Sequence, residues 1–203
     1  MSTHATTRRI AFAAVTLLIA VAIGVYALMS SPQQGQRSFG EALVGGPFTM
    51  VNQKGETVSE KSFAGKPMLL FFGYTYCPDV CPTELQVMAE ALRQLGDKAS
   101  DIQPILVSID PARDTPQVLA DYVANFGPQF VGLTGTPEQV KAMADAYRVF
   151  YAKVENKDDP KAYLMDHSSI IYLMGPDGKF LKHFTYSTDA KALAEGIAAA
   201  LGR

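Results

Sequence analysis

The sequence of 203 residues has few of the side chains that build disulfides or bind metals. It contains only two cysteines, Cys77 and Cys81, and three histidines. A disulfide between cysteines so close in the sequence would close a very small loop, and small loops stabilise a fold little. The cysteine pair therefore needs a reason other than cross-linking the chain.

Basic clusters and internal repeats are missing as well. The formal net charge is -2 at pH 7, and no block of lysine and arginine stands out. We therefore expect no nucleic-acid partner. Hydrophobic residues make up 48% of the chain, which is enough for a sizeable core and argues against global disorder. The length suits one ordinary domain with an appendage.

One long stretch near the N-terminus, residues 10–29, carries no charge. As a helix rising about 1.5 Å per residue, it would cover about 30 Å, the thickness of a bilayer core. Arg8 and Arg9 precede it, and no lysine or arginine follows before Arg37. The positive-inside rule then places the N-terminus in the cytoplasm and the rest of the chain on the far side. A cleaved signal peptide is the alternative.

These signals divide the chain into four parts. We expect a single-pass anchor in a bacterial inner membrane and a C-terminal domain in the periplasm. The cytoplasmic N-terminus, the transmembrane anchor, the polar linker and the domain would span residues 1–9, 10–29, 30–42 and 43–203, respectively.

Apolar patterning after residue 42 alternates between strands and helices. Residues 48–58 indicate a β-hairpin, and the continuous apolar run at residues 68–74 is typical of a buried strand. The spacing of apolar residues predicts further strands at residues 102–109, 130–134, 169–173 and 180–185, and helices at residues 82–95, 115–126, from 136 onward and at 188–201. Residues 149–154 fit a strand or a turn. This order predicts an α/β fold, a mixed sheet with helices on both faces.

The two cysteines lie between the predicted buried strand and the first long helix, in the segment Tyr76-Cys77-Pro78-Asp79-Val80-Cys81-Pro82. Functional groups of open α/β sheets gather beyond the carboxyl ends of strands. Because Pro82 disfavours helical geometry at the preceding residue, we expect Cys81 to be the N-cap and Cys77 to lie in the loop. A helix N-terminus favours thiolate, the form that binds metals and attacks disulfides.

A copper ion fits this pair best. Two thiolates select Cu(I), and an added imidazole also tolerates Cu(II). His167 is the best available imidazole, in a loop before the strand predicted at residues 169–173. It comes near Cys77 and Cys81 if that strand lies beside residues 68–74. Zinc is the competitor, but structural zinc sites use four protein ligands and the chain offers few candidates for the fourth.

Each of these features also has an ordinary structural explanation. A histidine before a strand is commonly a loop or capping residue, and the cysteines could form an inert bridge. We expect His4 and His183 to be incidental. Asp79 and Asp166 would face solvent or support the ligands from outside, rather than bind the metal themselves. The segment at residues 110–116 is most simply a strand-to-helix loop with an N-cap, although its Arg113 could instead brace the site through an ion pair.

Three segments together resemble the Sco/SenC family: YCPDVCP at residues 76–82, DPARDTP at residues 110–116, and Asp166-His167-Ser168. The resemblance covers roughly residues 42–203, and the charge-free stretch before it agrees. It implies a thioredoxin-like fold with an extra N-terminal β-hairpin. It also implies a mononuclear copper site made by Cys77, Cys81 and His167, holding one ion as Cu(I) or Cu(II).

The same resemblance implies a partner. The protein would deliver copper to the binuclear copper centre of cytochrome c oxidase subunit II, or reduce the cysteines of that centre. Other copper chaperones and a thioredoxin-like reductant are further expected partners. A metallochaperone of this kind is not an enzyme.

The alternative is a thiol–disulfide oxidoreductase or redox sensor that uses Cys77 and Cys81 as a disulfide pair. The family contains members of these kinds, and the motif does not separate them. A thioredoxin-type C-x-x-C would need a cysteine where Val80 stands, and the extra residue suits a metal ion better. A peroxiredoxin-like site would need proline and threonine where Leu70 and Tyr74 stand, which argues against that activity.

Overall fold

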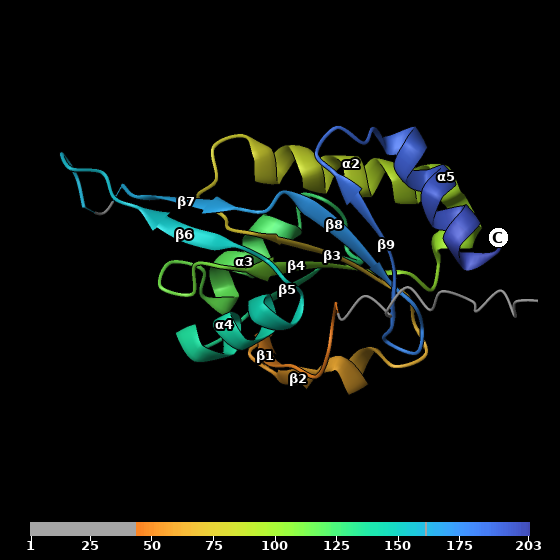
Figure 1. Cartoon of the computed structure of the whole chain (residues 1–203), viewed down its shortest axis with the longest axis horizontal. Helices are drawn as coiled ribbons and strands as arrows, with labels where there is room; N and C mark the ends of the chain where they lie inside the picture. Colours follow the sequence, from red (N-terminus) through yellow and green to blue (C-terminus); the bar gives the residue numbers. More distant parts are fainter. Residues whose placement is uncertain (1–43, 161) are drawn as a thin grey trace, which may run out of the picture. The chain divides into compact units, whose positions relative to one another are not determined.

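The computed structural model describes residues 44–160 and 162–203 (Figure 1). The predicted N-terminal segment, anchor and linker lie outside these residues, so their boundaries and the membrane topology stay predictions. Within the described part of the chain, no helix is long and apolar enough to cross a membrane.

Strands and helices follow the predicted order, with one added strand at Leu164–His167. The strands are β1 (Thr49–Asn52), β2 (Thr57–Ser59), β3 (Met68–Gly73), β4 (Gln103–Ser108), β5 (Val131–Thr134), β6 (Tyr151–Val154), β7 (Leu164–His167), β8 (Ile170–Met174) and β9 (Phe180–Thr185). The helices are α2 (Val80–Leu95), α3 (Pro116–Val123), α4 (Pro137–Ala146) and α5 (Ala190–Leu201), with short 3-10 turns at Glu60–Phe63 and Gly96–Ala99.

The main sheet is seven-stranded and mixed, in the order β2-β1-β5-β4-β3-β8-β9. Strands β3, β4 and β5 run parallel, while β8 pairs antiparallel with β3 and β9 antiparallel with β8. The predicted N-terminal hairpin, β1–β2, joins the sheet through antiparallel pairing of β1 with β5. Every residue of β3 is buried, as the continuous apolar run predicts for a central strand.

Helices cover both faces of this sheet, as predicted. Neighbouring residues of a strand point to opposite faces. Phe71 and Gly73 face the side of α2, because a Cβ added at Gly73 would meet the sulfur of Cys81. Phe72 faces the other side, where its ring lies 5.5 Å from that of Tyr147 at the end of α4. Helices α2 and α5 pack against each other on the first face (Figure 1).

The β6–β7 hairpin was only partly anticipated. It forms a separate two-stranded sheet that extends away from the seven-stranded one (Figure 1). His167 is the last residue of β7, paired with Tyr151, so the prediction that it lies in a loop is wrong. A four-residue strand that contains Asp166 and His167 carries a weak strand pattern. It pairs with β6, the strand before it, across a connection from Val154 to Leu164 that is too long to carry a tight-turn signal.

The start of α2 corrects a second prediction. The N-cap is Asp79 rather than Cys81, and the helix begins at Val80. The Thr83 amide donates to the carbonyl of Asp79 at 3.3 Å and closes the first turn. Pro82 is tolerated as the third helical residue, because amides of the first turn have no acceptor within the helix. Helix α4 begins with a capping box, in which Thr136 and Gln139 are bonded to each other's amides.

Candidate metal centre

Strand register brings three loops together at one end of the central strands. Gly73, the end of β3, lies beside Ser108, the end of parallel β4. Phe71 lies opposite Ile171 of antiparallel β8, so the chain just before β8 passes the same end of β3. Residues that follow β3, follow β4 and precede β8 therefore meet there. The condition for bringing His167 near the cysteines, that its following strand lies beside β3, is met.

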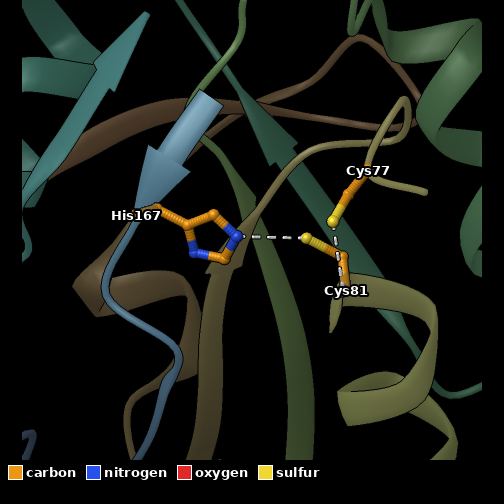
Figure 2. A group of neighbouring side chains, drawn as sticks. All are labelled: Cys77, Cys81 and His167. Atoms are coloured by element: carbon orange, nitrogen blue, oxygen red, sulfur yellow. Dashed lines mark hydrogen bonds between the residues drawn. The ribbon is translucent and has the colours of Figure 1, made fainter. Parts of the chain in front are cut away.

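Cys77, Cys81 and His167 point toward one another at this end of the central strands (Figure 2). Their two sulfurs and one ring nitrogen all lie within 4.8 Å of one another. The Sγ of Cys81 lies 3.4 Å from Nε2 of His167, and the Cys81 amide donates to the Sγ of Cys77 at 3.3 Å. No carboxylate joins the group in the part of the chain that the structure describes. The arrangement offers a metal two sulfurs and one imidazole.

The two sulfurs differ in charge. Hydrogen bonds from the Cys81 thiol, from His167 and from backbone amides at the start of α2 lower the pKa of Cys77 to about 3, against the opposing effect of burial. The same bond to Cys77, together with burial, raises the pKa of Cys81. Cys77 is therefore the thiolate and is half-buried, while Cys81 is fully buried and keeps its proton. A metal ion that replaces this proton gains the second thiolate.

The imidazole of His167 is oriented for ligation. Its Nδ1 lies 3.3 Å from the carbonyl oxygen of Ser168. Because a carbonyl only accepts hydrogen bonds, Nδ1 carries a proton, and in the neutral ring the lone pair is then on Nε2, the nitrogen that faces the cysteines. The rings of Phe71 and Tyr74 stand nearly perpendicular to the imidazole, at 5.8 and 6.0 Å between centroids, and limit its rotation. A backbone carbonyl on the far nitrogen is the usual partner of a metal-bound histidine.

A buried carboxylate anchors the cysteine loop. Asp114 accepts hydrogen bonds from the Thr75 hydroxyl at 2.5 Å, from the Thr75 amide at 3.2 Å and from the Ser108 hydroxyl at 2.6 Å. Burial raises the pKa of Asp114 above its ordinary value, and these hydrogen bonds offset only part of that rise. Sequence reasoning missed this anchor, because an aspartate before Thr115-Pro116 reads as part of a helix cap. Only the parallel pairing of β3 with β4 brings Asp114 to Thr75.

The other polar candidates take the expected places. Asp79, Asp166 and His183 are exposed and outside the cluster, and His4 is outside the described residues. Arg113 does form the ion pair that was considered for it, with Nε 2.5 Å from Oδ2 of Asp110.

Comparison with known proteins decides the family. The family model described as SCO1/SenC matches residues 36–202. The chain belongs to the SCO1/SenC family. This SCO1/SenC chain is 40% identical over 191 residues to a SCO2-like protein of Rickettsia felis, covering 89% of this chain and 93% of that protein. It is also 42% identical to the mitochondrial SCO1 homolog 1 of Arabidopsis thaliana, covering 79% of this chain and 48% of that longer protein.

Solved structures agree with the fold. Arabidopsis thaliana ScoI with copper bound is 41% identical, with a TM-score of 0.74 over 77% of this chain and 97% of that one. Bradyrhizobium japonicum ScoI with copper bound is 42% identical, with a TM-score of 0.71 over 78% and 99%. BsSco, in which a disulfide switch was identified, is 28% identical, with a TM-score of 0.61 over 77% and 92%, and is described as a member of the Sco family of cytochrome c oxidase assembly proteins. The thioredoxin-like fold implied by the family resemblance is confirmed.

Proposed function

We propose that this SCO1/SenC protein binds one copper ion through Cys77, Cys81 and His167 and passes it to a cytochrome c oxidase. The observation that carries the proposal is the convergence of two sulfurs and one ring nitrogen within 4.8 Å. Two soft sulfurs favour Cu(I), and the imidazole lets the same site hold Cu(II). With three protein ligands in the described residues, the cluster lacks the fourth that structural zinc sites use.

The recipient we propose is subunit II of cytochrome c oxidase, whose binuclear copper centre would receive the ion or have its cysteines reduced. Support comes from the oxidase-assembly description of the similar BsSco and from the copper-bound relatives. Cys77 and His167 are only half-buried, so an incoming ligand can reach the ion and replace them one at a time. Ligand exchange of this kind needs no chemical turnover.

The membrane placement is part of the same proposal. Residues 10–29 would anchor the chain in a bacterial inner membrane, with residues 43–203 in the periplasm. The absence of charge in residues 10–29 and the preceding Arg8 and Arg9 support it.

Metal analysis of the reduced full-length chain tests the copper site, with His167→Ala as the probe and His183→Ala as the control. His183 is an exposed histidine on β9, away from the cluster. The parent and His183→Ala should each hold one copper ion per chain. The His167→Ala variant keeps two thiolates, which can bind Cu(I) linearly, so it should lose Cu(II) far more than Cu(I). The loss of Cu(II) affinity should be larger than about 10- to 100-fold, which is the usual effect of removing a group that orients a ligand without binding the metal.

The visible spectrum gives a second measurement in the same samples. Thiolate-to-Cu(II) charge transfer should produce strong absorption in the parent and collapse in His167→Ala. A His167→Ala protein with the parent's spectrum and Cu(II) affinity would show that His167 is not a ligand, and the proposed site would be wrong.

A thiol–disulfide oxidoreductase is the second candidate, favoured by the charge of the cysteines. Both cysteines are free, and the Cys77 thiolate lies within 4.8 Å of the Cys81 sulfur. The thiolate of Cys77 would attack one sulfur of a partner disulfide and release the other as a thiolate. Cys81 would then attack Cys77, form the internal disulfide and leave the partner reduced. His167→Ala separates the two functions, because disulfide reduction does not require the imidazole and Cu(II) binding does.

A further inference from the structure

The hairpin that carries His167 is not hydrogen-bonded as a strand to the seven-stranded sheet. Within the described residues, β7 pairs only with β6, whereas both cysteines follow β3 of the main sheet. Apart from the short link from His167 to β8, side-chain contacts therefore have to fix the distance from the imidazole to the sulfurs. We infer that Arg113 is a positioning residue that holds the His167 hairpin against the cysteine loop. The inference rests on the proposed copper site.

Arg113 contacts the hairpin at Tyr163, the residue immediately before β7. Its Nη1 donates to the carbonyl oxygen of Tyr163 at 3.0 Å, and its Cζ lies 3.6 Å from the centroid of the Tyr163 ring. The Tyr163 hydroxyl in turn donates to Oδ1 of Asp110 at 2.8 Å, and Oδ2 of Asp110 accepts from Nε of Arg113. Backbone, ring and hydroxyl of one tyrosine are thus bound to one Arg–Asp pair, which belongs to the loop after β4.

The same guanidinium contacts the segment that carries the cysteines. Its Cζ lies 4.6 Å from the centroid of the Tyr76 ring, and Tyr76 is the residue before Cys77. A more distant contact, at 5.8 Å, reaches Tyr74, whose hydroxyl accepts a hydrogen bond from the amide of Met165 in β7. Arg113 therefore touches both ligand-bearing segments without being a ligand.

Burial makes this contact specific for arginine. The side chains of Arg113 and Asp110 are only 14% and 4% exposed, so the ion pair is shielded from water. Arginine can donate from two nitrogens in fixed directions and stack its flat face on a ring at the same time. Lysine offers one ammonium, which can stay paired with Asp110 but cannot also reach the Tyr163 carbonyl with the same geometry. An arginine-to-lysine change should therefore keep the charge but lose the contacts to the carbonyl and ring of Tyr163.

Other bonds keep the hairpin folded when Arg113 is changed. The amide of Met165 still donates to Tyr74, and the amide of Ser168 donates to the carbonyl of Phe150 at 3.0 Å. Strand β8 begins only three residues after His167. Loss of the Arg113 contacts should therefore loosen the imidazole relative to the sulfurs rather than unfold the domain.

The test compares Arg113→Lys with Arg93→Lys in the full-length chain. Arg93 is paired with Glu90 at the same three-residue spacing, but its side chain is 74% exposed and it lies in the last turn of α2, at the opposite end of that helix from Cys81. Tyr163→Phe is a milder variant that removes only the hydroxyl bond to Asp110. Cu(I) and Cu(II) affinities are measured separately for each protein, together with the charge-transfer spectrum.

Arg113→Lys should lower Cu(II) affinity by about 10- to 100-fold, the usual effect of disturbing a group that orients a ligand. Cu(I) affinity should change much less, because the two thiolates do not lie on the hairpin. Tyr163→Phe should show a smaller loss of the same kind, and Arg93→Lys none. If Arg113→Lys leaves both affinities unchanged, or lowers them by the same factor, Arg113 has no positioning role and the inference is wrong.

Hydrogen exchange distinguishes this failure from failure of the proposed function. If the parent binds no copper at all, the proposed function fails. The positioning role of Arg113 is then tested in the metal-free chain. Amides of residues 164–167 should then exchange faster in Arg113→Lys than in Arg93→Lys. Equal exchange in the two variants would overturn the inference on its own terms.

Discussion

Gly73 is the residue at which a single added methyl group should disturb the candidate copper site most directly. It ends β3 beneath the cysteine loop, and a Cβ placed there would lie 2.8 Å from the Sγ of Cys81 and 2.9 Å from Cε1 of Phe71. Non-bonded heavy atoms settle at about 3.5 Å or more, so the sulfur would have to move by about 0.7 Å. Sites of this kind tolerate displacements of about 0.5 Å. Gly73→Ala should therefore weaken copper binding.

The cost to the fold should be modest. Overpacking a buried position lowers the free energy of unfolding by about 1–3 kcal/mol. Replacing glycine by alanine restores about 0.4–1 kcal/mol, because the unfolded chain loses conformational freedom. The net loss should be about 0–2.6 kcal/mol, which leaves an ordinary domain folded.

Gly132→Ala is the matched control. Gly132 is in β5, and a Cβ there would lie 3.0 Å from Cβ of Leu119 and 3.3 Å from Cγ1 of Val123, both in α3. This change overpacks the same sheet without touching Cys77, Cys81 or His167. It should lower stability to a similar extent and leave copper binding intact.

Thermal unfolding and copper titration of the two variants give the answer. Both should unfold at a lower temperature than the parent, and only Gly73→Ala should lose Cu(II) affinity and charge-transfer absorption. Parent-like Cu(II) binding by Gly73→Ala would refute the reasoning, because the sulfur would then not depend on its close approach to β3. Equal losses of copper binding in both variants would refute it too, since the effect would follow general instability.

Two further predictions concern the cysteines and the membrane. Because the pKa of Cys77 is lowered to about 3, the thiolate persists as the pH falls and is lost only below that value. Alkylation of Cys77 in the metal-free protein should be nearly constant from about pH 8 to about pH 5, whereas an ordinary thiol would slow by about tenfold per pH unit; such a slowing would contradict the assignment. A reporter fused after Arg203 should be active only outside the cytoplasm, and a cytoplasmic signal would overturn the proposed topology.

The order of elements was accessible from the sequence because local patterns carry it. The apolar run of β3 is continuous since the strand is buried on both faces, and the helices begin at recognisable Thr-Pro and Asp signals. The start of α2 was misjudged, because the preference against helix before Pro82 is weak compared with the packing of a fully buried Cys81. The strand that ends at His167 was missed, because its strand pattern is weak and the connection from β6, between Val154 and Leu164, is too long for a recognisable tight turn.

The sequence by itself determined the chemistry that is available: two cysteines at the junction of a buried strand and a helix, and a histidine shortly before a later strand. Those are properties of residue type and local spacing, so they can be identified from the sequence alone. Only the tertiary structure decided that the three side chains converge, that Cys77 is the ionised sulfur and that Asp114 holds the cysteine loop. It alone shows Arg113 between Tyr163 and Tyr76. Distances between segments far apart in the chain are set by sheet register and packing, which no local pattern encodes.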